Sequence, residues 1–136
     1  MSEKFTTEVP VRFRDLDPLD HVNNAVHATY IETARTEYLE TVLDIPQDEV
    51  SFVIANLELT YKRPITIDDE PVVALEVTDL GESSCTMAYE IRTGEEVATT
   101  AETTMVQIDP ETGRPAPIPD AIREQVREFE GLGVPA

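Results

Sequence analysis

The chain has 136 residues, of which 28 are acidic and 10 are basic, and its formal net charge at pH 7 is −18. A charge of that size repels nucleic acids and anionic membrane surfaces, so we expect neither as a partner. Hydrophobic residues make up 40% of the chain, and this fraction and the length fit one domain over residues 1–136 with a buried core.

The single cysteine and the first residues bear on the cellular compartment. Cys85 has no second cysteine to pair with in the chain, which is typical of a reducing compartment. The first ten residues, MSEKFTTEVP, lack the apolar core of a signal peptide, and no run approaches the roughly 20 apolar residues of a membrane span. We therefore expect a cytoplasmic protein.

The basic residues are eight arginines and only two lysines, Lys4 and Lys62. Many acids, few lysines and many threonines suit a protein that stays soluble in concentrated salt, and a salt-loving host is our hypothesis. The alternative is an ordinary acidic protein, and stability measured against KCl concentration separates the two. Either answer concerns the surroundings of the protein and not its chemistry.

Hydrophobic periodicity predicts one long helix followed by a series of strands. Apolar and polar residues alternate over residues 5–14, which predicts a first strand. Apolar spacings of three and four from Asn24 onward predict the helix, and Pro46 limits it. The full prediction is a strand at 5–14, a helix at 24–43, strands at 53–62, 71–80, 84–93 and 97–108, a short helix at 120–129 and a loose tail at 130–136.

This order of elements predicts an α+β fold. Short turns between the later strands indicate an antiparallel sheet, and the long helix can cover one of its faces. The other face would then carry apolar side chains that nothing in the chain covers. We therefore expect self-association through that face or through a sheet edge.

A cluster of polar residues separates the first strand from the helix: Asp15, Asp17, Asp20, His21, Asn23 and Asn24. Such residues are most often turn and capping residues. A helix N-terminus also presents free N–H groups that can hold an oxyanion, and a nearby carboxylate can attack a carbonyl or activate water. Asp17, held extended by Pro18, suits that role. Asp15 and Asp20 compete with it, and the local pattern does not choose between them.

Other kinds of site find little support in the sequence. Cys85 lies far from both histidines, which argues against a Cys–His pair. His21 and His27 are six residues apart and do not share a helix face, so we expect no metal site. The first glycine is Gly81, so no glycine-rich phosphate loop precedes the helix.

The segment RFRDLDPLDHVNNAVHATYIETAR, residues 12–35, resembles the acyl-CoA thioesterases of the 4-hydroxybenzoyl-CoA thioesterase type, which have the hot-dog fold. The family pattern is an aromatic residue, then D-x-D-x-x-G-H-x-N-N, then a helix ending E-x-x-R. The resemblance continues through LTYKRPITIDDEPVVALEVTDLGESS and GRPAPIP and covers most of the chain. The matching residues are Phe13, Asp15, Asp17, His21, Asn23, Asn24, Tyr30, Glu32 and Arg35.

The resemblance implies a curved antiparallel sheet of about five strands wrapped around one long helix. It also implies a homodimer or homotetramer with the site between subunits. Asp17 matches the catalytic carboxylate, and Asn24 matches the residue whose backbone amide polarises the thioester carbonyl. His21 and Asn23 match the substrate-binding part of the motif. The family usually has glycine where this chain has Asp20, and aspartate tolerates the positive φ that glycine permits there better than most residues do.

We therefore expect a thioesterase that hydrolyses an acyl-CoA, with an acyl-carrier-protein thioester as the second choice. Coenzyme A enters as part of the substrate, and no other cofactor is expected. Lys62 and Arg63 are our candidates for contact with its phosphates, against the alternative that they balance neighbouring acids. A non-catalytic acyl-CoA-binding module and a hot-dog enoyl-CoA hydratase remain alternatives. Glu32, on the helix, is an alternative catalytic carboxylate.

Overall fold

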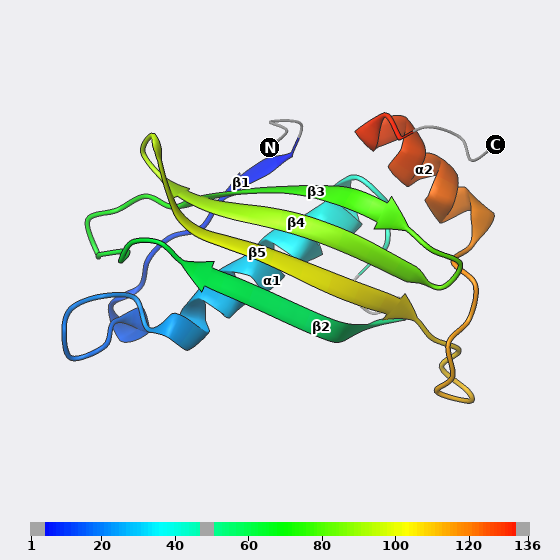
Figure 1. Ribbon diagram of the computed structural model, residues 1–136, viewed down its shortest axis with the longest axis horizontal. Coiled ribbons are helices and arrows are strands. Elements are labelled where there is room, and N and C mark those ends of the chain that lie inside the picture. The colour runs from blue at the N-terminus through cyan, green and yellow to red at the C-terminus, as the bar shows by residue number, and fades with distance from the viewer. Residues whose placement is uncertain (1–4, 47–50, 133–136) are drawn as a thin grey trace.

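A computed structural model describes residues 5–46 and 51–132 of the chain (Figure 1). Its centre is an antiparallel sheet of five strands in the order β1-β3-β4-β5-β2, with helix α1 lying across one face. The elements are β1 (Thr6–Glu8), a 3-10 turn (Phe13–Asp15), α1 (Asn24–Thr41), β2 (Phe52–Tyr61), β3 (Val72–Leu80), β4 (Ser84–Thr93), β5 (Glu96–Gln107) and α2 (Asp120–Glu130). The α+β architecture predicted from the sequence is confirmed.

Helix α1 packs one apolar stripe on the inner face of the sheet. Ile31, Ala34, Tyr38 and Leu39 recur at helical spacing, and each is at most 5% exposed. They meet the alternate residues of β4 from Cys85 to Ile91, all buried. This contact forms the core and fixes where the N-terminus of α1 lies over the sheet.

The outer face of the sheet carries mostly threonine and glutamate. On β2 and β5 the outward register pairs Glu58 with Glu102 and Thr60 with Thr100. The outward residues of β4 between the buried ones include Thr86. The expected uncovered apolar face is therefore wrong for most of the sheet, because most apolar residues of these strands alternate onto the helix side. Val53 and Val106 form an apolar pair on the outer face.

The unpaired apolar surface lies instead along β2, an edge strand of the sheet. Val53, Ile54, Leu57 and Tyr61 are 43–45% exposed. Apart from Val53, these side chains are in register with inward-facing residues of β5 and point toward the side of the sheet that carries α1. The edge of the sheet remains a candidate surface for self-association.

The first strand is shorter than predicted. Strand β1 ends at Glu8, and the chain turns away near Pro10, which has no N–H to donate to a sheet. Residues Phe13–Asp15 form a 3-10 turn instead, in which the Asp15 carboxylate accepts the backbone N–H of Arg12 at 2.9 Å. Phe13, predicted as a strand residue, is 85% exposed.

Helix α2 packs beside β3, near the C-terminal end of α1 (Figure 1). Its last residue, Glu130, belongs to the segment predicted as a loose tail. The Glu130 carboxylate accepts hydrogen bonds from the Tyr38 hydroxyl and the Val77 backbone N–H, both at 2.7 Å. Gly131 then ends the helix at a φ of 72°. Residues 133–136 of the predicted tail lie outside the described residues. Neither described helix is long and apolar enough to cross a membrane.

Candidate active site

A tight turn over residues 17–21 precedes α1. Leu16 and Val22 face each other in an isolated β-bridge that closes the turn. Inside it, the Asp17 N–H donates to the His21 carbonyl at 2.7 Å, and the Asp20 N–H donates to the Asp17 carbonyl at 3.0 Å. Asp20 has a φ of 61°. The left-handed conformation expected at the position of the family's glycine is thus adopted by aspartate.

The same turn orients the Asp17 carboxylate. Its Oδ1 accepts the backbone N–H of Leu19 at 2.9 Å and that of His21 at 3.2 Å. No group among the described residues donates to the second oxygen, Oδ2. One oxygen therefore holds the carboxylate in place, and the other is available to a water molecule or a substrate.

The start of α1 leaves one backbone N–H unused. The Asn23 side chain accepts the N–H of Ala25 at 2.9 Å, and the Asn23 carbonyl accepts the N–H of Val26 at 2.9 Å. Within the described part of the chain, the N–H of Asn24 has no acceptor. The N–H of Asn24 is therefore a free donor at the positive end of the helix dipole.

Five of the six residues predicted for the site line one pocket: Asp17, His21, Asn24, Lys62 and Arg63. The pocket has a volume of about 330 Å³. Its lining comes from the turn, the start of α1 and the end of β2, and these three segments lie at the same end of the molecule (Figure 1). The sixth residue, Asn23, is not in its lining and acts as the helix cap.

The competing carboxylate Asp15 has a structural role. It is 3% exposed, and its Oδ2 accepts the Arg12 backbone N–H at 2.9 Å and the Tyr30 hydroxyl at 2.8 Å. Burial acts to raise the pKa of Asp15, but these hydrogen bonds and the Arg12 guanidinium together hold it below the ordinary value of 3.8. The Asp15 carbonyl also accepts the Asn23 N–H at 2.8 Å, which fixes the helix start.

Four residues of the pocket lining were not predicted as site residues: Val22, His27, Tyr61 and Pro64. His27 is 2% exposed, and its Nδ1 lies 2.7 Å from the Thr99 hydroxyl. Burial lowers the pKa of His27 below 6.5, against a hydrogen bond to the backbone of Val22, so the ring is neutral at pH 7. The Tyr61 ring packs edge-on against His27 at 5.0 Å, and its hydroxyl donates to the Asn24 carbonyl at 2.8 Å.

The spacing of His27 on α1 could have indicated its place, since it follows Asn24 by three residues and shares its helix face. Tyr61 lies in the segment LTYKRP, which the family resemblance covers, but the sequence gave it no role in the site. Its neighbourhood depends on how far β2 extends toward the start of α1, which is a tertiary contact.

The two predicted phosphate contacts differ. The backbone N–H groups of Lys62 and Arg63 both donate to the Ala98 carbonyl, at 2.8 and 3.1 Å, which holds the two residues at the rim of the pocket. Arg63 forms an ion pair with Glu96. Lys62 forms no ion pair with any described residue, so it is the cation more available to an anionic ligand.

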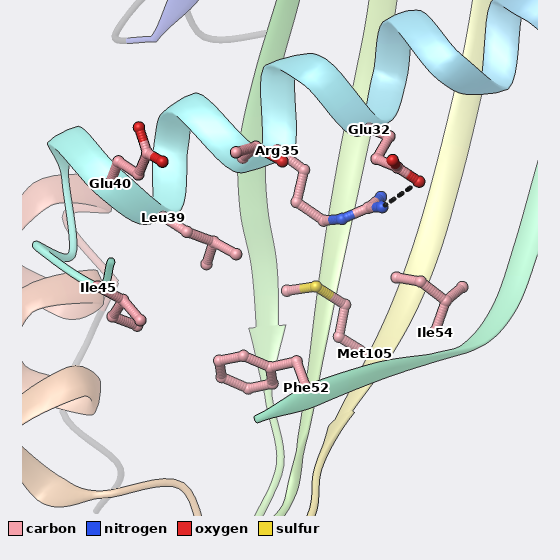
Figure 2. Close-up of a pocket in the computed structure, with 9 residues that line it drawn as sticks. Glu32, Arg35, Leu39, Glu40, Ile45, Phe52, Ile54 and Met105 are labelled. Atoms are coloured by element: carbon pink, nitrogen blue, oxygen red, sulfur yellow. Dashed lines mark ion pairs between the residues drawn. The ribbon is translucent and has the colours of Figure 1, made fainter. Parts of the chain in front are cut away.

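The remaining candidates lie elsewhere. Cys85 is buried in β4, and burial raises the pKa of its thiol to about 12, so it is not a nucleophile at neutral pH. Glu32 points to solvent at 72% exposure, 3.9 Å from Arg35, and lines a different pocket (Figure 2). Among the described residues, no group of three His, Cys, Asp or Glu side chains could hold a metal ion.

Comparison with known proteins gives one consistent result. The model of the Thioesterase-like superfamily matches residues 11–126. A thioesterase of Thermus thermophilus, whose crystal structure contains coenzyme A and zinc, is 42% identical, with a TM-score of 0.88 over 98% of this chain and 100% of that one. Escherichia coli K12 long-chain acyl-CoA thioesterase FadM is 28% identical over 128 residues, 90% of this chain and 97% of its own. Acyl-CoA thioester hydrolase YbgC of Escherichia coli O6:H1 is 28% identical over 131 residues, 93% of this chain and 96% of its own.

Proposed function

The chain belongs to the Thioesterase-like superfamily, and we propose that it hydrolyses acyl-CoA thioesters in the pocket that Asp17 and Asn24 share. The hot-dog fold and the family suggested by residues 12–35 are confirmed. One observation supports placing the reaction in this pocket. A carboxylate oxygen and a helix N-terminal N–H, both unbonded among the described residues, border the same pocket.

In the proposed reaction, the thioester carbonyl oxygen accepts the N–H of Asn24 at the positive end of α1. This donor stabilises the oxyanion that forms on attack, and the loss of one such donor costs about 10²–10³-fold in rate. Asp17 either attacks the carbonyl carbon to form an anhydride, which water hydrolyses, or takes a proton from the water that attacks. On both routes the C–S bond breaks and coenzyme A leaves as the thiol.

The other predicted residues support this centre in different ways. His21 lines the pocket and contributes a backbone N–H that orients the Asp17 carboxylate. Asn23 saturates the N–H groups of Ala25 and Val26, which leaves the N–H of Asn24 as the free donor. Lys62, at the rim, is the proposed contact for a coenzyme A phosphate.

We further propose that two copies pair through the β2 edge and that the second copy helps to enclose the pocket. The edge strand is ten residues long, and the apolar residues Ile54, Leu57 and Tyr61 on its inner side are 43% exposed. The paired acids Glu58 and Glu102 on the outer face oppose a tetramer built by stacking two sheets. Sedimentation equilibrium should give the mass of two chains, and a stable monomer would contradict the pairing.

The function is tested with Asp17→Asn. We expect this variant to keep its fold and mass and to lose roughly 10³-fold or more in kcat/KM for acyl-CoA hydrolysis, measured as release of free thiol. The matched control is Asp20→Asn, in the same turn, because Asp20 is exposed and its φ of 61° suits asparagine as well. This control should keep most of the activity.

The assay also separates the alternatives. Full activity in Asp17→Asn would refute the proposed mechanism. Tight acyl-CoA binding by the wild type without thiol release over hours would indicate a binding module instead. Loss of the conjugated double bond of an enoyl-CoA, without thiol release, would indicate a hydratase. Parallel assays with acyl-carrier-protein thioesters identify the preferred carrier.

A further inference from the structure

Two further pockets lie between α1 and β2, further along both elements from the reaction pocket. One, of about 260 Å³, is lined by Ala28, Ile31, Leu57 and Thr103 among others. The next, of about 340 Å³, has a mixed lining (Figure 2). It combines the apolar residues Leu39, Ile45, Phe52, Ile54 and Met105 with the polar residues Glu32, Arg35, Thr36 and Glu40. The two share Glu32, Arg35 and Ile54 in their linings, so they adjoin.

The three pockets follow one line because α1 and β2 run in opposite directions. Tyr61, at the end of β2, contacts Asn24 and His27 near the start of the helix. The pocket of Leu57 also has Ala28 in its lining, one turn further along α1. The residues from Phe52 to Ile54, at the start of β2, line the last pocket together with the second half of α1.

Tyr61 lies on β2 between Leu57, which lines the second pocket, and Lys62, which lines the first. It lines the reaction pocket but not the pocket that begins at Ala28. Its ring packs against His27, and its hydroxyl donates to the Asn24 carbonyl at 2.8 Å. The side chain therefore spans the space from the edge strand to the first turn of α1.

We propose that Tyr61 sets the length of the acyl group, by ending the reaction pocket and admitting only short chains. Ala28 lies four residues beyond Asn24, about 6 Å along the helix axis at 1.5 Å per residue. An extended alkyl chain advances roughly 1.3 Å per carbon, given a C–C bond near 1.5 Å. An acyl chain therefore reaches the start of the second pocket, at Ala28, after about five carbons, and Tyr61 ends the reaction pocket before that point. This inference rests on the proposed function and assigns the specificity of the same pocket.

The test measures kcat/KM for acyl-CoA substrates from two to sixteen carbons. Wild type should prefer chains of up to about six carbons. Tyr61→Ala removes the ring and joins the pockets, so the ratio of kcat/KM for twelve carbons to that for four should rise at least tenfold. Tyr61→Phe keeps the ring and should keep the wild-type ratio. Leu59→Ala is the matched control, because Leu59 lies on the same face of β2 but lines none of the three pockets.

The ratio is compared within each variant, so a general loss of activity through Asn24 does not affect it. If Tyr61→Ala does not fold, Tyr61→Leu serves as the smaller change with the same expected direction. An unchanged ratio, an equal rise in Leu59→Ala, or a wild-type preference for twelve to sixteen carbons would overturn the role of Tyr61. Hydrolysis that depends on Asp17 would survive any of these results, so the two proposals fail separately.

Discussion

Asp15 and Asp17 are two residues apart and lie in opposite surroundings. Both Asp15 oxygens face donors, from the Tyr30 hydroxyl and from the backbone and guanidinium of Arg12, and the side chain is 3% exposed. Asp17 has one oxygen held by the backbone of its own turn and lines the reaction pocket. The carboxylate of Asp15, with donors on both oxygens, has a structural role. The carboxylate of Asp17, with a donor on one oxygen, keeps the other oxygen available for the proposed reaction.

Asp15→Asn should cause the largest loss of stability among the substitutions that compare these two aspartates. Asparagine keeps one oxygen for the Arg12 N–H and the Tyr30 hydroxyl, but it loses the negative charge and turns an NH₂ donor toward the Arg12 guanidinium. We therefore expect the free energy of unfolding to fall by about 2–3 kcal/mol. Urea unfolding measures this loss, with Asp17→Asn as the control that should stay near wild type. Equal destabilisation by the two substitutions would remove the distinction between them.

The pH dependence of unfolding tests whether Asp15 is ionised in the folded protein. The pKa of Asp15 is lower in the folded protein than the ordinary 3.8, so its ionised form favours folding. That contribution is fully present above pH 3.8 and is lost as the pH falls through the folded value. The difference in unfolding free energy between wild type and Asp15→Asn should therefore shrink below pH 4. A difference that stays constant in acid would contradict the assigned ionisation.

A smaller effect should come from the turn that holds Asp17. Asp20 has a φ of 61°, which a β-branched residue adopts only with strain. Asp20→Val should cost about 1–2 kcal/mol of stability and lower kcat, because the turn N–H groups that orient Asp17 shift. Asp20→Gly is the control and should keep the wild-type stability and the wild-type kcat. Wild-type stability in Asp20→Val would show that the left-handed turn is not required.

The elements built on periodicity were predictable from the sequence. The strands after α1 agree with their predicted bounds to within about one residue, because alternation of buried and exposed side chains repeats over nine to twelve residues. Helix α1 begins at the predicted Asn24 because Asn23 is a strong cap. Local patterns with a clear physical cause were enough for these parts.

The N-terminal turn was not predictable in the same way. The alternation over residues 5–14 looks like a strand, but the Asp15 carboxylate binds the Arg12 N–H and bends the chain into a 3-10 turn. The hydrophobic periodicity of the sequence does not indicate that hydrogen bond. It also turns Asp15 away from the direction of Asp17, so a choice that the local pattern left open depended on a tertiary contact with Tyr30.

The candidate site residues came from the family motif more than from physical reasoning alone. The motif lies in one segment and named Asp17, His21 and Asn24, which the structure brings to one pocket. Tyr61 lies 37 residues from Asn24 in the chain and meets it only through the placement of β2 beside α1. No spacing rule within the sequence reports such a contact.

The proposed reaction requires the carboxylate of Asp17 and the N–H of Asn24 to act on one thioester carbonyl. The most direct test is a crystal structure with a bound non-hydrolysable acyl-CoA analogue. The carbonyl oxygen of the analogue should lie about 2.7–3.1 Å from the backbone nitrogen of Asn24, with the carbonyl carbon facing Asp17. An analogue bound with its carbonyl beside Glu32 and Arg35, away from both groups, would contradict the account.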